Sequence, residues 1–327
     1  MAIAHEGTSR ILLTVIPGLS DQYRSLIRTA AVSRGFEALF FESPSAAGDT
    51  LRKAEIIFGH DPALAENVPA LRWLCSPFAG VDQFLPAAVF RTGQAQLTNS
   101  SGAYGVTIAE HIVMVLLTLL RRQIEYNDIV SCRQWKRDLP IRSIRGSRIT
   151  LAGTGDIGRE TAARLRAFSP LRVIGINRSG RNPDGVFDRV LPIDDWETVL
   201  PETDVLILSL PGTPETSGIL GEKQLSLLPG GAVVINVGRG SAICQKALEK
   251  KLREGRLSAG LDVFEQEPIP PDDPLWSCPN LMITTHTAGN LTLPYTVDRI
   301  VRMFLENLDH YCEHKPLAHR VDPARGY

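Results

Sequence analysis

The chain has few of the features that mark secreted, membrane-bound or nucleic-acid-binding proteins. Its 327 residues include five cysteines, an odd number with no CxxC pair, which does not fit a disulfide framework. The formal net charge is −1, so no field of one sign attracts nucleic acid or an anionic membrane surface. The longest apolar run, residues 112–117, is far shorter than the roughly 20 residues that span a bilayer. We therefore expect a reduced, cytoplasmic protein without a membrane or nucleic-acid partner.

Two further patterns are missing. The first ten residues, MAIAHEGTSR, lack the charged-then-apolar order of a signal peptide. His310, Cys312 and His314 are close in sequence, but they lack the spacing of a four-ligand zinc site. We predict no metal.

Alternating apolar runs and helical stretches predict about two α/β domains, which also suits the length. In the first hundred residues the strand candidates are ILLTVI, AEIIFG and RWLCS, with a helix that ends at Gly35 between the first two. Residues 105–122 form a long helix that is apolar around most of its circumference, which predicts burial in a core or against a second subunit. A second unit begins at Ser147 with RITLAG, a glycine loop, a helix over 159–168 and LRVIGI, and continues with DVLILSL, GAVVINV, AGLDVF and LMITT. A last helix over 294–314 follows.

The glycine loop has the pattern G-x-G-x-x-G over residues 153–158. A strand precedes it, a helix follows, and another strand closes the βαβ unit, which raises an otherwise weak signal. Such glycines allow a tight turn, so that the pyrophosphate of a dinucleotide can bind at the helix N-terminus. The predicted contacts are Gly153, Gly155, Asp156, Ile157 and Gly158.

The strand that closes this unit ends in Asn177-Arg178-Ser179, with Arg181 close behind. An NAD-selective site usually has a carboxylate here that binds the ribose 2′-OH, and this chain has none before Asp184. Arg178 can instead pair with a 2′-phosphate and Ser179 can donate a hydrogen bond to it. We therefore predict that NADP(H) is preferred over NAD(H); the alternative is that Arg178 and Arg181 are solvated loop charges.

Three polar residues each follow a predicted buried strand: Arg239 follows AVVINVG, Glu267 follows AGLDVF, and His286 follows LMITT. In an open parallel sheet, ligands bind at the carboxyl ends of the strands. Arginine presents a fork that matches a carboxylate, and a histidine held by a neighbouring carboxylate can protonate a carbonyl oxygen as hydride arrives at its carbon. These three residues can therefore bind a carboxylate substrate and move a proton.

The motifs FAGVD, TIAEH, GTGDIG, PGTPETSG, NVGRG, DVFEQEP and TTHTAG stand in one order along the chain. In that order they resemble the D-isomer-specific 2-hydroxyacid dehydrogenases, which include glyoxylate/hydroxypyruvate reductases. The resemblance implies that Arg239 binds the substrate, that His286 is the acid/base, and that Glu267 pairs with His286. The N-terminal unit matches least, and Thr285 stands where the family usually has proline.

The resemblance implies further site residues. The substrate carboxylate is expected to bind a loop formed by Phe78, Ala79 and Gly80, together with Arg239 and His286. Trp135 stands where some relatives place an aromatic near the active site of the partner subunit. The remaining expected cofactor contacts are Pro211, Thr216, Val237, Gly238, Arg239, Asp262, His286 and Gly289. Asp262 resembles the family aspartate near the nicotinamide, although it can equally cap a turn.

We thus expect two Rossmann-like domains with parallel sheets and an active site in the cleft between them. Residues 1–104 plus 293–327 would form the substrate-binding domain, and 105–292 the dinucleotide-binding domain, in a homodimer. The expected reaction is NAD(P)H-dependent reduction of a small 2-keto acid, such as glyoxylate or hydroxypyruvate, to the D-2-hydroxy acid. The alternatives are an NAD-linked D-lactate or D-3-phosphoglycerate dehydrogenase and a dinucleotide-sensing, corepressor-like binding protein.

Overall fold

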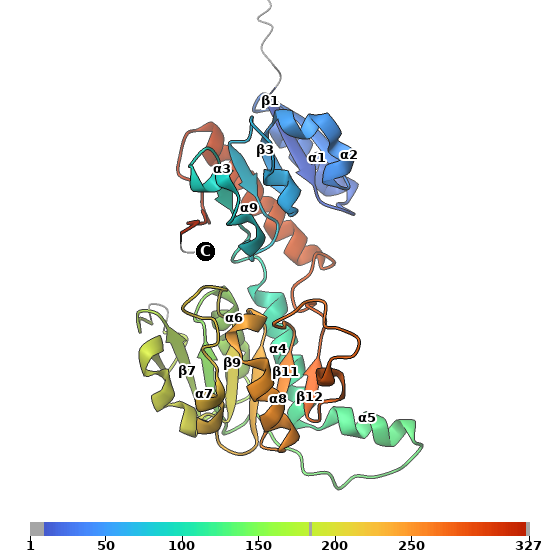
Figure 1. Ribbon diagram of the computed structural model, residues 1–327, viewed down its shortest axis with the longest axis vertical. Coiled ribbons are helices and arrows are strands. Elements are labelled where there is room, and N and C mark those ends of the chain that lie inside the picture. The colour runs from blue at the N-terminus through green and yellow to red at the C-terminus, as the bar shows by residue number, and fades with distance from the viewer. Residues whose placement is uncertain (1–9, 183–184, 325–327) are drawn as a thin grey trace, which may run out of the picture. The chain divides into compact units, whose positions relative to one another are not determined.

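The computed structural model describes residues 10–182 and 185–324. Asp184 and the first nine residues of the N-terminal stretch lie outside the described residues. The chain forms two compact units: unit 1 comprises Met1–Ala103 and Leu291–Tyr327, and unit 2 comprises Tyr104–Asn290. Each unit is an α/β structure built on one sheet of parallel strands, so the predicted fold class is confirmed (Figure 1). A cleft between the domains stays a prediction.

Unit 1 has a five-stranded sheet in the order β2-β1-β3-β4-β5, in which every pair is parallel. Its strands are β1 (Arg10–Val15), β2 (Phe36–Phe41), β3 (Ala54–Gly59), β4 (Trp73–Cys75) and β5 (Gln96–Thr98). Its helices are α1 (Asp21–Val32), α2 (Pro44–Ala47), α3 (Ala88–Arg91) and α9 (Pro294–Cys312), with short 3-10 turns η1 (Gly48–Lys53), η2 (Pro62–Ala65) and η3 (Asp82–Phe84). The strand order reverses between β1 and β3, which makes that point the topological switch of the sheet.

The last helix, α9, belongs to unit 1 because its apolar side packs on β3 and β4. The Phe304 ring stacks on Phe58, with centroids 4.2 Å apart, and also lies against Trp73 at 5.3 Å. All three side chains are fully buried. Burying three aromatic side chains removes a large apolar area from water, so these contacts bind the C-terminal helix firmly to the N-terminal sheet.

Unit 2 has a seven-stranded sheet in the order β12-β11-β10-β9-β6-β7-β8, again parallel throughout. Its strands are β6 (Arg148–Ala152), β7 (Arg172–Asn177), β8 (Arg189–Pro192), β9 (Val205–Leu208), β10 (Ala232–Asn236), β11 (Leu257–Leu261) and β12 (Leu281–Ile283). Its helices are α4 (Gly105–Leu120), α5 (Gln123–Ser131), α6 (Asp156–Arg166), α7 (Glu222–Leu227) and α8 (Gln245–Arg253), with η4 (Ile193–Thr198), η5 (Leu200–Glu202), η6 (Gly240–Ala242) and η7 (Pro274–Ser277). The order is that of a doubly wound Rossmann sheet with its switch between β6 and β9.

Both faces of this sheet are covered, which explains why its strands read as continuous apolar runs rather than alternating ones. Leu206 and Leu208 of β9 pack into the core that also holds Leu248 of α8, while Val205 and Ile207 are equally buried outside that cluster. On the other side, α4 contacts α6, β10 and β11. Beyond α4, α5 and the segment after it project from the body of unit 2 (Figure 1).

The structure corrects several predicted elements. Helix α6 begins at Asp156, three residues before the predicted start, because its first turn contains the loop glycine Gly158. The predicted 105–122 helix ends at Leu120, since Arg122 has a left-handed φ of 53° before α5 starts. Strands β2, β5 and β8 and helices α5, α7 and α8 were not predicted.

Candidate active site

Three neighbouring strands of unit 2 deliver the predicted catalytic residues to one edge of its sheet. Strands β10, β11 and β12 are adjacent and parallel, so their carboxyl ends point the same way. Arg239 follows β10, Glu267 lies in the segment after β11, and His286 follows β12. The sheet geometry therefore gathers a guanidinium, a carboxylate and an imidazole within one unit.

His286 and Glu267 are in direct contact. The distance between Nδ1 of His286 and Oε2 of Glu267 is 2.7 Å. The other carboxylate oxygen, Oε1, accepts a hydrogen bond of 2.9 Å from the backbone N–H of Phe264, which fixes the carboxylate. Because Nδ1 is engaged, Nε2 is the ring nitrogen left to face a substrate, and 54% of the His286 side chain is exposed. The pair thus has the arrangement of an oriented general acid.

Asp262 holds the segment that carries His286. Its buried carboxylate accepts hydrogen bonds from Thr284 Oγ1 (2.6 Å), from the N–H of Thr287 (2.8 Å) and from the N–H of Ala288 (3.0 Å). Its backbone carbonyl accepts from the N–H of His286 at 2.9 Å. These four bonds secure His286 in a left-handed conformation with φ 55°. The side chain therefore performs a loop-fixing role, and its expected contact with the nicotinamide stays a prediction.

His111 of α4 extends this network. Its Nε2 lies 3.2 Å from Thr284 Oγ1, and Thr284 already donates its hydroxyl proton to Asp262. The Thr284 oxygen must therefore accept, so His111 carries a proton on Nε2. Burial lowers the pKa of His111, and the Asp262 carboxylate opposes that shift. A neutral His111 thus connects helix α4 to the His286 segment.

Arg239 lies in a tight turn after β10 that Asn236 closes. The Asn236 side chain accepts from the N–H of Gly238 (3.1 Å) and donates to the carbonyl of Arg239 (2.9 Å). The guanidinium donates to the Gly238 carbonyl at 2.9 Å and is partly exposed. Val237 and Gly238, which precede it, are buried, so their contribution to a ligand site is limited to the backbone.

The G-x-G-x-x-G loop of unit 2 forms an anion-binding helix start. Gly153 has φ 107°, and a Cβ at Gly158 would lie 2.1 Å from the Gly153 carbonyl, so both positions require glycine. Gly155 faces open space. Within the described residues, the N–H groups of Asp156, Ile157 and Gly158 donate to no protein acceptor, as expected for the first turn of α6. These amides suit a pyrophosphate.

Asp156 departs from a simple phosphate contact. Its carboxylate is turned toward the start of α4, where its Oδ2 would lie 2.4 Å from a Cβ on Gly105. This buried Oδ2 has no hydrogen-bond partner among the described residues. The side chain thus places negative charge at the N-terminus of α4, which the helix dipole favours, and only the backbone of Asp156 is available to a cofactor.

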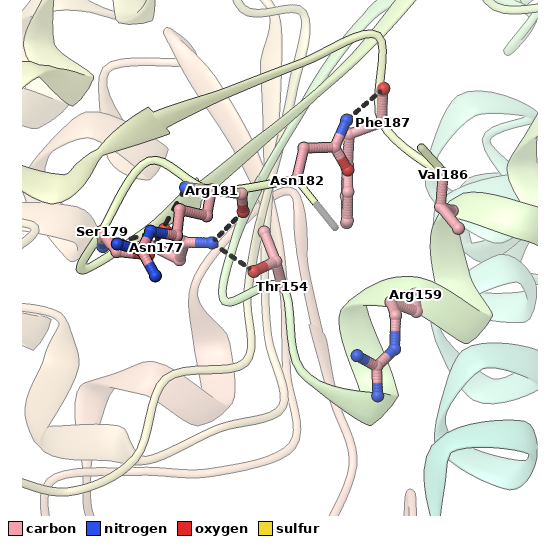
Figure 2. A pocket seen from close by; sticks show the side chains of 8 residues that line it. All are labelled: Thr154, Arg159, Asn177, Ser179, Arg181, Asn182, Val186 and Phe187. Atoms are coloured by element: carbon pink, nitrogen blue, oxygen red, sulfur yellow. Dashed lines mark hydrogen bonds between the residues drawn. The ribbon is translucent and has the colours of Figure 1, made fainter. Parts of the chain in front are cut away.

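A hollow of about 300 Å³ lies beside the end of β7 (Figure 2). The residues that line it are Thr154, Arg159, Asn177, Ser179, Arg181, Asn182, Val186 and Phe187. Asn177 fixes its rim, because its amide donates to Thr154 Oγ1 and the Arg181 carbonyl and accepts from the N–H groups of Ser179 and Gly180. The loop is therefore folded before a ligand arrives.

Arg178 does not line this hollow. It faces the neighbouring 211–216 loop, where its charge contributes to lowering the pKa of Glu215, after that residue's own backbone and Thr213 hydrogen bonds. In the same loop Thr216 Oγ1 donates to the Pro211 carbonyl at 2.6 Å. Gly289, the last expected cofactor contact, packs against Tyr104 and Ile108 at the start of α4.

The Phe78-Ala79-Gly80 loop belongs to unit 1, after β4, and is partly exposed. Trp135 lies in the projecting segment after α5, with 95% of its surface exposed.

Sequence reasoning missed Arg159 and His111 as parts of the site. Arg159 is the first residue after the glycine motif, so helical geometry places it on the loop side of α6. His111 had no local signal, because its partner Thr284 is 173 residues away.

The doubly wound sheet of unit 2, its glycine loop and the strand-end residues together define a dinucleotide-dependent α/β protein. Residues 113–288 match the family model of the D-isomer specific 2-hydroxyacid dehydrogenase, NAD binding domain. Over 256 residues the chain is 34% identical to a glyoxylate reductase of Korarchaeum cryptofilum, which covers 76% of this chain and 75% of that protein.

Solved structures resemble the whole chain. A D-isomer specific 2-hydroxyacid dehydrogenase family protein from Aeromonas salmonicida is 33% identical, with a TM-score of 0.85 over 97% of this chain and 100% of that one. An NADPH-dependent glyoxylate/hydroxypyruvate reductase from Sinorhizobium meliloti, in complex with NADP and sulfate, is 26% identical, with a TM-score of 0.82 over 97% and 100%. The chain belongs to the D-isomer specific 2-hydroxyacid dehydrogenase family. It is thus an oxidoreductase that binds a nicotinamide dinucleotide.

None of the helices described is long and apolar enough to cross a membrane. No group of three or more His, Cys, Asp or Glu side chains in this part of the chain is placed to hold a metal ion.

Proposed function

We propose that this protein reduces a small 2-keto acid, of the glyoxylate or hydroxypyruvate type, to the D-2-hydroxy acid with NADPH. The observation that carries the proposal is the 2.7 Å contact between His286 and Glu267, on the sheet edge that also bears Arg239. Similarity to a glyoxylate reductase and to an NADPH-dependent glyoxylate/hydroxypyruvate reductase supports this substrate class.

The residues of unit 2 fit a dinucleotide. The amides at the start of α6 are available for a pyrophosphate, and open space at Gly155 leaves room for it. The end of β7 offers Asn177, Ser179 and Arg181 to the adenosine half. When bound, the nicotinamide supplies a hydride to the carbonyl carbon of the substrate.

In this proposal His286 supplies the proton. As the carbonyl carbon gains a hydride, its oxygen takes the proton from Nε2 of His286, and one hydroxyl group results. Glu267 holds Nδ1 and stabilises the positive charge that the ring carries before transfer. Without this pair the reaction must draw its proton from water.

Arg239 and the 78–80 loop would bind the substrate. The guanidinium of Arg239 stays charged and can pair with both the carboxylate and the carbonyl oxygen, which polarises the bond that is reduced. The backbone N–H groups of Ala79 and Gly80 would bind the carboxylate, and Phe78 would shape the pocket around the substituent.

Three arginines support the preference for NADP(H). Arg181 lines the hollow with Ser179, Arg159 reaches it from α6, and Arg178 follows the end of β7 (Figure 2). A 2′-phosphate is best bound by such charged donors, whereas the 2′-OH of NAD needs an acceptor that none of them offers.

The direct test is the loss of NADPH absorbance with glyoxylate, hydroxypyruvate and pyruvate in turn. We expect turnover to a D-configured product, and a fall in kcat of roughly 10²–10⁴ for His286→Ala. No turnover of any 2-keto acid with NADPH or NADH would overturn the proposal. A pull-down that finds a partner protein instead would favour the corepressor-like alternative.

Cofactor preference is tested by paired titrations. Arg178→Asp and Arg181→Asp should each lower the ratio of kcat/KM for NADPH over NADH by roughly 10- to 100-fold, the value of a charge-assisted hydrogen bond. Arg145→Asp, at an exposed position elsewhere in unit 2, is the matched control. A wild-type enzyme that prefers NADH would favour the NAD-linked alternative.

We also propose a homodimer in a reducing, cytoplasmic compartment. The segment from α4 to residue 141 exposes Met114, Val130, Trp135 and Ile141, more apolar surface than a monomeric arm requires. All five cysteines are free thiols. Light scattering coupled to size exclusion would measure the mass, and a monomer at micromolar concentration would contradict the dimer.

A further inference from the structure

His60 lies at the topological switch of the unit 1 sheet. It directly follows β3, next to the point where the strand order reverses, and β4 and the 78–80 loop follow on the neighbouring strand. Switch points of parallel sheets are where ligands bind. The His60 ring is half-buried, and its centroid lies 4.6 Å from that of Phe78 and 5.5 Å from that of Phe84, both edge-on.

The two ring nitrogens of His60 differ in their shortest contacts, although the side-chain amide nitrogen of Gln83 also lies 3.4 Å from Nδ1. Nε2 lies 2.6 Å from the side-chain amide nitrogen of Gln83, which can only donate, so Nε2 accepts. Nδ1 therefore carries the proton and donates to Oγ of Ser76 at 2.8 Å. Ser76 is fully buried. These contacts fix both the tautomer and the orientation of the ring.

Ser76 connects His60 to the 78–80 loop by hydrogen bonds. Its Oγ accepts from the N–H of Phe78 at 3.1 Å and donates to the carbonyl of Phe78 at 3.2 Å. The same carbonyl accepts from the N–H of Ser100, and the carbonyl of Ala79 accepts from the side-chain amide of Asn99 at 2.8 Å. The carbonyls of Phe78 and Ala79 are thus both held by hydrogen bonds on the same side of the loop.

A trans peptide points its N–H opposite to its carbonyl. Because the carbonyls of Phe78 and Ala79 are held inward, the N–H groups of Ala79 and Gly80 point the other way. In the described part of the chain these two amides donate to no protein acceptor. Adjacent outward amides of this kind attract an anion.

We propose that His60 is a positioning residue that, through Ser76, orients the Ala79 and Gly80 amides toward the substrate carboxylate. The inference rests on the proposed function, since it assumes that this loop binds a keto acid. His60 touches neither substrate nor cofactor. It lowers KM by keeping the two donors in place before the substrate arrives, so that less conformational freedom is lost on binding.

Steady-state kinetics with glyoxylate measure the effect. His60→Ala and Ser76→Ala should each raise KM by roughly 3- to 10-fold, the value of one hydrogen bond, with a much smaller change in kcat. The KM for NADPH should not change, because its binding residues lie in unit 2. The double variant should be little worse than either single one, since both remove the same connection.

Two matched variants sharpen the result. His60→Asn keeps a donor at the position of Nδ1, so it should recover most of the affinity for glyoxylate. His314→Asn changes an exposed histidine of the same unit with a left-handed φ that asparagine tolerates, and it should leave KM unchanged. Equal losses in kcat and in KM for both substrates would indicate general damage and overturn the proposal.

Hydrogen exchange tests the role of His60 in ordering the loop separately from the proposed reduction of a keto acid. In His60→Ala, exchange of the Phe78 amide, which donates to Ser76, should accelerate within the segment 78–82, while His60→Asn should resemble the wild type. Unchanged exchange in this segment would overturn the role of His60 whatever the kinetics show. A wild-type protein that reduces no keto acid would overturn the proposed function alone, because exchange would still decide whether His60 orders the loop.

Discussion

At the residue scale, Asp262 and His111 both help to hold the segment that positions the His286 ring. Asp262 accepts three hydrogen bonds from the segment after β12, and His111 supports that segment through Thr284. Glu267 touches the ring itself. His286 is thus oriented by contacts to its ring and, separately, by contacts to its backbone.

The Asp262→Asn variant tests the backbone contacts. The new amide group would face N–H donors, so at least one bond to Thr287 or Ala288 is lost at a buried site. We expect the free energy of unfolding to fall by about 1–3 kcal/mol and kcat to fall with it. Chemical denaturation and glyoxylate turnover measure the two effects. Asp195→Asn, at an exposed position, is the control; equal stability of both variants would contradict the role of Asp262.

His111 predicts a pH dependence of stability. Burial holds its pKa below the ordinary value of 6.5, while the unfolded chain binds a proton near pH 6.5. Below that pH the unfolded state therefore gains protons that the folded state resists, and the free energy of unfolding falls. Above pH 6.5 His111 is neutral in both states, and the full free energy of unfolding is present.

The His111→Gln variant tests this dependence. The glutamine amide can still donate to Thr284 but does not titrate. Denaturation between pH 5 and 8 should show a smaller loss of stability on the acid side for the variant than for the wild type. Parallel curves for the two proteins would contradict the prediction.

At the scale of elements, the start of α6 contains Gly158, which the fold requires, and Gly155, which we expect only the cofactor to require. Gly158→Ala would place a Cβ against the Gly153 carbonyl and should cost about 1–3 kcal/mol of stability. Gly155→Ala meets nothing in the protein, so its melting temperature should change little, while NADPH affinity falls because the methyl group occupies space for the pyrophosphate. Thermal melts measure the stability of the two variants, and fluorescence titration measures their affinity for NADPH. Equal losses of melting temperature in Gly158→Ala and Gly155→Ala would contradict the prediction.

The sequence predicted the central strands well and missed three of the four edge strands; the fourth, β12, was predicted as LMITT. Strands β1, β3, β6, β9 and β10 are buried on both faces, so their apolar runs are continuous. The missed strands β2, β5 and β8 are all edge strands, and partly exposed side chains interrupt their patterns. An edge strand pairs with only one neighbouring strand and is less covered than a central strand, so its side chains need not form a continuous apolar run.

The candidate site shows the same division. Arg239, Glu267 and His286 could be proposed because strand ends are visible in sequence and parallel strands end at one edge. The links between His111 and Thr284, and between His60 and Ser76, could not be proposed, because they depend on which helices and strands pack together in the fold. Arg159 was not proposed as a site residue, because the helix was predicted to begin at Arg159 and in fact begins at Asp156.

At the scale of the whole molecule, unit 2 is one continuous stretch inserted between the two parts of unit 1. It has its own buried core of strand and helix side chains. We therefore expect residues 104–290 to fold when expressed alone and to bind NADPH without reducing glyoxylate, since the 78–80 loop is absent. Circular dichroism and NADPH titration check this; an unfolded fragment would contradict the independence of unit 2.

The exposed Trp135 gives the molecule an optical signal of its own. Trp73 and Trp196 are buried and Trp276 is half exposed, whereas Trp135 is almost entirely in contact with water. Its emission should therefore dominate the red edge of the spectrum and be the most readily quenched by iodide. If two chains associate through the projecting segment, dilution alone will shift that emission, and a Trp135→Phe variant will lose the shift.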